Sequence, residues 1–121
     1  MAKIKPYEVD PKEKREIIED LFLAISRLKT KKEIIDFFLG LFTASEVLMI
    51  ARRIQVAKLL LEEKSYNQIQ SKLGASSQMI NKTDIWLHDG NEKYVKWLTK
   101  VIANIDEGKE VLDIDNYSDG S

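Results

Sequence analysis

The feature that most constrains this chain is a spaced set of helix-start signals. Three pairs have a threonine or serine followed three residues later by glutamate or glutamine: Thr30 with Glu33, Thr43 with Glu46, and Ser65 with Gln68. In such a capping box, each side chain accepts a hydrogen bond from the backbone N–H of the other residue, which satisfies amides left unpaired at a helix start. The three pairs predict helices over about 31–41, 44–63 and 66–73.

Further N-caps complete the pattern. They are Asp10, before Pro11, for a helix over about 11–29, Ser76 for one over about 77–88, and Asn91 for one over about 92–106. Apolar residues recur at helical spacing in these segments, and no segment shows convincing strand alternation. The chain is therefore predicted to be all-α, with six helices.

Composition narrows the possible functions. The chain has 121 residues, which suits one domain with a sizeable core. It contains no cysteine and one histidine, so we expect neither a thiolate nor a histidine-cluster metal site. No carboxylate pair, Gly-rich phosphate loop or nucleophile motif stands out, so we expect neither an enzyme nor a cofactor. No apolar run approaches the length of a membrane span, and a cytoplasmic location is predicted.

The charge is unevenly distributed, although the net charge is only −1. Residues 51–82 carry six basic and two acidic side chains, whereas residues 105–121 carry six acidic side chains and one lysine. Local positive charge is what phosphate contacts require. We expect an N-terminal arm at 1–10, a helical domain at 11–106, and an acidic, disordered tail at 107–121.

Residues 66–88 have the pattern of a helix-turn-helix. Ile69, Leu73, Ala75 and Ile80 are small or apolar where two helices must pack together, and Gly74 lies where the chain must turn. A helix of about eight residues is not stable alone, but it suits the supporting helix of such a unit. The pattern predicts double-stranded DNA as a partner.

The candidate DNA-binding residues fall into two groups. At the start of the second helix, where side chains can reach base edges or phosphates, are Ser76, Ser77, Gln78, Asn81 and Lys82. Candidates for phosphate contacts elsewhere are Arg52, Lys58, Lys64 and Lys72.

The same region resembles the Trp repressor superfamily, and in particular its TrpR-like YerC/YecD group. The resemblance rests on Leu41, Thr43 and Glu46, on an arginine-rich helix with leucines at its end, and on Leu-Gly-Ala at 73–75. It spans about 50 residues directly, and the six-helix layout extends it to about 90. It implies an intertwined homodimer whose two reading heads lie about one DNA turn apart.

The resemblance also implies a position for a tryptophan corepressor. Thr43 and Arg53 are retained, Lys82 stands for a second arginine, and Thr83 and Trp86 replace a glycine and a serine. We expect the two larger side chains to fill this vestigial effector pocket, so that tryptophan is not bound. Trp86 is alternatively a core residue that packs on the last helix.

The predicted function is thus a sequence-specific, repressor-like transcriptional regulator that does not respond to tryptophan. The alternative is a helical interaction module that has kept the scaffold and lost DNA binding. Two features favour that alternative: the net charge of the chain is slightly negative, and the second helix of the motif lacks arginine.

Overall fold

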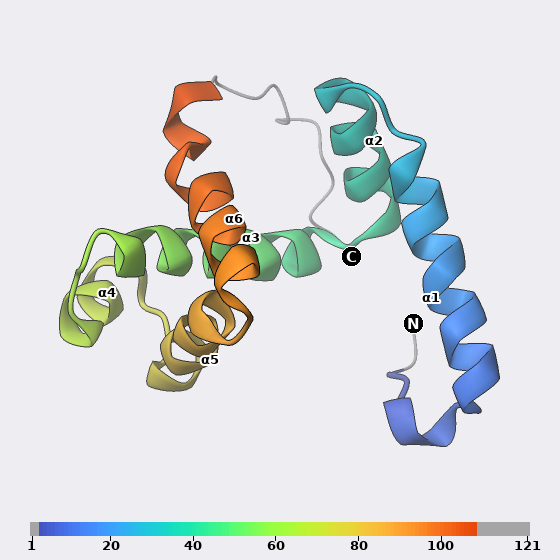
Figure 1. Ribbon diagram of the computed structural model, residues 1–121, viewed down its shortest axis with the longest axis horizontal. Coiled ribbons are helices and arrows are strands. Elements are labelled where there is room, and N and C mark those ends of the chain that lie inside the picture. Colours follow the sequence, from blue (N-terminus) through green and yellow to red (C-terminus); the bar gives the residue numbers. More distant parts are fainter. Residues whose placement is uncertain (1–2, 109–121) are drawn as a thin grey trace. The chain divides into compact units, whose positions relative to one another are not determined.

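The computed structural model describes residues 3–108, and their secondary structure is entirely helical (Figure 1). The elements are η1 (Pro6–Glu8), α1 (Pro11–Ser26), α2 (Lys31–Leu41), α3 (Ala44–Leu61), α4 (Tyr66–Leu73), α5 (Ser77–His88), α6 (Glu92–Ala103) and η2 (Ile105–Gly108). Six α-helices and no strand lie in this range, which confirms the predicted all-α fold. The backbone divides into two compact units, the first ending at Leu41 and the second beginning at Phe42.

The predicted capping boxes form. Thr43 Oγ1 accepts a hydrogen bond from the Glu46 N–H at 3.1 Å, and Glu46 Oε1 accepts one from the Thr43 N–H at 2.8 Å. The same reciprocal pairs join Ser65 to Gln68 and Thr30 to Glu33. The side chains at positions 10, 76 and 91 cap α1, α5 and α6.

Three helices end earlier than their apolar patterns predict. α1 ends at Ser26 instead of about 29, α3 at Leu61 instead of about 63, and α6 at Ala103 instead of about 106. The chain leaves α3 because Glu63 adopts a left-handed conformation, with φ 61°. The Lys64 N–H then donates to the Leu59 carbonyl, which closes the helix end as a Schellman motif does. A left-handed residue there is normally glycine, so the sequence gives no signal for this end.

The second unit is organised around α3, which contacts α4, α5 and α6 (Figure 1). One buried cluster joins α3 to the α4–α5 segment and consists of Val56, Leu59, Ile69, Ala75 and Ile80. A second joins α3, α5 and α6 and consists of Ala57, Leu87, Leu98 and Ile102. Ile69 and Ile80 are fully buried, and burying side chains of this size contributes about 2 to 3 kcal/mol each. The two clusters hold α4 and α5 on one helix.

The first unit has no comparable core. Neither α1 nor α2 contains a buried residue. Large apolar side chains of α1 are exposed instead, with Phe22 61% and Ile17 54% accessible. Two amphipathic helices without a buried side chain leave an apolar surface exposed to water, and such a surface is typical of an interaction site.

The predicted flanking segments are only partly visible. The expected N-terminal arm contains η1, and the first two residues of the expected acidic tail belong to η2. Residues 109–121 of that tail lie outside the described residues. Between residues 3 and 108, no helix combines the length and the apolar character that crossing a bilayer requires.

Candidate nucleic-acid interface

α4 and α5 are joined by a turn that has the geometry of a helix-turn-helix. Gly74 follows α4 in the left-handed conformation, with φ 67°, and its N–H donates to the Gln70 carbonyl at 2.8 Å. Ala75 is buried in the turn, and Ser76 then caps α5 by accepting from the Met79 N–H. Two residues thus separate the left-handed glycine from the first residue of α5, so the direction changes sharply.

One side of α5 is fixed in the core. Ile80, Thr83 and Leu87 are buried, at a spacing that places them on one helical face. The Thr83 hydroxyl is satisfied within the helix, since Oγ1 donates to the Met79 carbonyl at 2.7 Å. The core therefore sets the rotation of α5 about its axis, and with it the side chains that face outward.

The five residues predicted to read DNA are all exposed on the first part of this helix or at its cap. They are Ser76, Ser77, Gln78, Asn81 and Lys82. The structure thus brings together at one helix start the polar side chains that the sequence pattern singled out. Ser76 has its hydroxyl engaged as the cap, whereas no hydrogen bond within residues 3–108 is made by the side chains of Gln78 or Asn81.

The four outlying cations are in different surroundings. Lys64 and Lys72 are exposed next to the two ends of α4. Arg52 is half-buried and lines a groove together with Gly74 and Ser76, beside the turn. Lys58 instead forms an ion pair with Asp106 at 2.7 Å, and its side chain is 27% exposed. A cation that already has a carboxylate partner is a poor candidate for a phosphate contact, and we leave Lys58 out of the proposed interface.

A hydrogen-bonded connection between α4 and α5 was not anticipated from the sequence. The Tyr66 hydroxyl donates to Oδ2 of Asp84 at 2.9 Å. Nδ1 of His88 lies 2.9 Å from the backbone carbonyl oxygen of Asp84 and 3.1 Å from its Oδ1. Because Tyr66 and Asp84 are 18 positions apart, no local sequence pattern could pair them. The pair adds a polar contact to the apolar packing that fixes the two helices.

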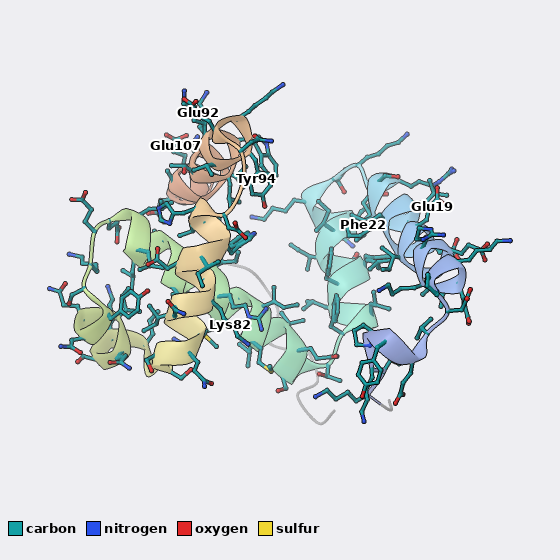
Figure 2. The ribbon with its side chains drawn as sticks, turned by 60° about the horizontal axis from the view of Figure 1, so that its bottom comes forward. Glu19, Phe22, Lys82, Glu92, Tyr94 and Glu107 are labelled. Carbon is teal, nitrogen blue, oxygen red and sulfur yellow. The ribbon has the colours of Figure 1, made fainter. Side chains whose placement is uncertain are left out.

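The predicted effector residues surround a pocket of about 500 Å³ between α3 and α5. We call this the α3–α5 pocket; it is lined by Ile50, Arg53, Ile54, Ser76, Gln78, Met79, Lys82, Thr83 and Trp86. Figure 2 shows Lys82 on the side of α5 that faces α3. Thr43 does not line the pocket, because its hydroxyl caps α3. Thr83, which is buried, and Trp86, which is 37% exposed, both line the pocket, and the expectation that their side chains fill it remains a prediction.

These features define a helix-turn-helix protein with exposed polar side chains at the start of its second helix. The chain belongs to the Trp repressor family: the family model described as "Trp repressor protein" matches residues 16–102. It is also 34% identical over 84 residues to "Uncharacterized protein YerC" of Bacillus subtilis (strain 168), a match that covers 69% of this chain and 81% of that protein. No solved structure matches the chain. The family is a family of regulators, and the resemblance found in the sequence is confirmed.

Proposed function

We propose that this protein is a sequence-specific DNA-binding transcriptional regulator that reads the major groove with α5. The observation that carries the proposal is the orientation of α5: its inner face is locked by Ile80, Thr83 and Leu87, and this leaves Gln78, Asn81 and Lys82 exposed. Asparagine and glutamine amides can bond adenine edges in pairs, and lysine can bond guanine or phosphate. Membership of a regulator family supports this reading.

The remaining cations suit contacts to the phosphate backbone. Lys64 precedes α4, the supporting helix, Lys72 lies in its last turn, and Arg52 lies beside the turn between α4 and α5. In helix-turn-helix complexes the supporting helix crosses the DNA backbone while the second helix enters the groove. Phosphate contacts of this kind position the protein, and base contacts supply the sequence preference.

The proposed active form is a homodimer. α1 and α2 contain no buried residue, and their exposed apolar side chains include Ile17, Phe22 and Ile34. An apolar surface of this kind is expected to be covered in solution, and a second copy of the chain covers it symmetrically. A dimer also supplies two copies of α5, as a two-fold symmetric operator requires.

The protein is further proposed to bind DNA without tryptophan. Thr83 and Trp86 line the α3–α5 pocket at the positions where the resemblance implies a glycine and a serine, and Lys82 lacks the flat guanidinium that stacks on an indole. Isothermal titration is expected to show no stoichiometric binding of tryptophan at micromolar concentration. A stoichiometric micromolar complex would refute this part of the proposal.

A helical interaction module is the second candidate, and one observation favours it. The described part of α5 carries a single lysine and no arginine, and the whole chain has a net charge of −1. A module of this kind would dimerise through α1 and α2 but ignore DNA.

The two candidates differ in a fluorescence-anisotropy titration of mixed-sequence duplex DNA at two low salt concentrations. A regulator binds with an affinity that falls steeply as salt rises, because neutralising phosphates releases counterions. An interaction module shows no binding at protein concentrations up to about 100 μM, where even non-specific affinity is measurable.

A further inference from the structure

The α3–α5 pocket combines apolar walls with uncompensated positive charge. Ile50, Ile54, Met79 and Trp86 supply apolar surface, and Arg53 and Lys82 supply the charge. Among residues 3–108, no carboxylate lines the pocket and neither cation forms an ion pair. Such a surface is complementary to an extended segment in which acidic and apolar side chains alternate.

The chain itself contains a segment of that chemistry. Residues 109–121 include four acidic side chains and four apolar ones: Glu110, Val111, Leu112, Asp113, Ile114, Asp115, Tyr117 and Asp119. One lysine, Lys109, opposes this charge. The segment thus offers anions for the two cations of the pocket and apolar groups for its walls.

The point at which this segment leaves the described structure is close to the pocket. Asp106 is held to α3 by its 2.7 Å ion pair with Lys58. Ile105 packs against the same buried cluster as Ile54, and Ile54 lines the α3–α5 pocket. Lys58 follows Ile54 by about one helical turn, roughly 6 Å along α3. Thirteen residues can extend roughly 40 Å, so the segment from 109 onward has ample length to reach the pocket.

We propose that residues 109–121 bind in the α3–α5 pocket of their own chain and compete there with DNA. Glu110, Asp113 or Asp115 pair with Arg53 and Lys82, and the intervening apolar side chains cover Trp86. The competition follows from shared residues, since Ser76, Gln78 and Lys82 line the pocket and also belong to the proposed DNA-reading surface. This consequence for DNA rests on the proposed function, whereas occupation of the pocket does not.

Occupation can be measured without DNA, because the chain has only two tryptophans. In a Trp97→Phe background, acrylamide quenching and the emission maximum report on Trp86. The full-length tail variant neutralises four carboxylates: Glu110→Gln, Asp113→Asn, Asp115→Asn and Asp119→Asn. The matched control makes the same change in net charge on exposed carboxylates of α1: Glu13→Gln, Glu16→Gln, Glu19→Gln and Asp20→Asn. Circular dichroism and gel filtration establish that both variants are folded and have the same oligomeric state.

We expect the tail variant, and not the control, to show stronger quenching of Trp86 and emission at longer wavelength. Equal quenching in the two variants would overturn the inference. Quenching that depends on protein concentration and not on the tail would also overturn it, because a second copy would then cover the pocket.

The same variants without the Trp97 substitution are then titrated with mixed-sequence duplex DNA. Release of two cations should raise the affinity for DNA at low salt in the tail variant only. It should also steepen the salt slope, which is the slope of log affinity against log salt concentration, by about two. If no variant binds DNA but Trp86 still responds to the tail, the DNA-binding proposal fails and the intramolecular contact stands. If both variants gain the same affinity, the tail acts through net charge alone and competition at the pocket is refuted.

Discussion

The phenolic hydroxyl of Tyr66, the first residue of α4, donates a 2.9 Å hydrogen bond to Oδ2 of Asp84, beyond the middle of α5. The bond therefore links the supporting helix to the proposed reading helix at a point away from the turn. The pKa of Tyr66 is raised above its ordinary value of 10.0, first by this hydrogen bond and then by burial. The contact restrains the angle at which α5 is presented.

We expect Tyr66→Phe to weaken DNA binding by at most about tenfold, the value of one hydrogen bond, without changing the salt slope. The slope stays the same because no cation is removed. Anisotropy titrations at several salt concentrations measure both quantities. Tyr7→Phe is the matched control: Tyr7 is 79% exposed, and its replacement should change neither the DNA affinity nor the salt slope. A change in slope for Tyr66→Phe would mean that the substitution moves a cation away from the phosphates, and so does more than change the angle of α5.

Glu63 and Gly74 both adopt a left-handed conformation and should respond to substitution in opposite ways. Glu63, at φ 61°, carries a side chain in a conformation that costs non-glycine residues about 1 kcal/mol. Glu63→Gly should therefore stabilise the protein by up to that amount. Gly74→Ala should destabilise it by about 1 kcal/mol through its backbone alone, since an added Cβ meets nothing within 4 Å.

Urea unfolding at one fixed protein concentration measures both changes. Gly40→Ala supplies the control, because Gly40 is helical and its Cβ would also meet open space. This substitution should stabilise the protein by about 0.5 kcal/mol. Destabilisation by Glu63→Gly would show that the carboxylate has a role that outweighs backbone strain.

Two lysines should differ in their contribution to DNA binding. Lys72→Gln is expected to weaken binding to all sequences and to lower the salt slope by about one, as loss of one phosphate contact does. Lys58→Gln should leave the slope unchanged, because Lys58 is paired with Asp106. Both variants change the charge equally, so each controls for the other. Equal slopes in the two variants would contradict this prediction, because either both lysines or neither would then contact a phosphate.

Substitution of the reading residues should change sequence preference more than overall affinity. Once an operator has been selected from random duplexes, Gln78→Ala or Asn81→Ala is expected to relax the preference at particular base pairs, by about 1 to 3 kcal/mol each. Selection from random sequence with each variant gives the measurement. Asn104→Ala, at an exposed residue directly after α6 and outside the proposed interface, is the control. Unchanged preferences in both variants would mean that the assigned face of α5 is wrong.

The Thr43–Glu46 capping box should make part of the stability dependent on pH. The pKa of Glu46 is lowered from its ordinary value of 4.5, first by the Thr43 backbone N–H that donates to its carboxylate. A pKa that is lower in the folded state stabilises the protein above the unfolded value, and this contribution is lost as the pH falls through the folded value. Glu46→Gln should therefore be less stable than the wild type at about pH 7, and this difference should be smaller at about pH 3.

Urea unfolding at the two pH values tests this expectation. Glu19→Gln is the control, because Glu19 is exposed on α1 outside any cap, and its difference from the wild type should stay small at both values. A stability gap for Glu46→Gln that did not change with pH would exclude the carboxylate charge as its cause.

Local chemistry explains why so much of the fold was predictable. The Ser65–Gln68 and Thr43–Glu46 boxes lie within one helical turn, so their hydrogen bonds are encoded by spacing alone, and they form as predicted. The same holds for Gly74, whose left-handed conformation is the one that a glycine between two helices favours. The predicted ends of α1, α3 and α6 were too late, because the helical spacing of apolar residues can continue past the residue at which the backbone leaves the helix.

The sequence by itself determined the helices, their caps and the polar side chains at the start of α5. Only the tertiary structure decided which of these groups meet. Packing on α3 turned Ile80 and Thr83 inward and so chose the exposed face of α5; it also paired Lys58 with Asp106 and Tyr66 with Asp84. It separated Thr43 from the pocket that Arg53 and Trp86 line. The physical reason is range: a capping bond depends on residues three positions apart, whereas a pocket or an ion pair depends on distant segments that share one core.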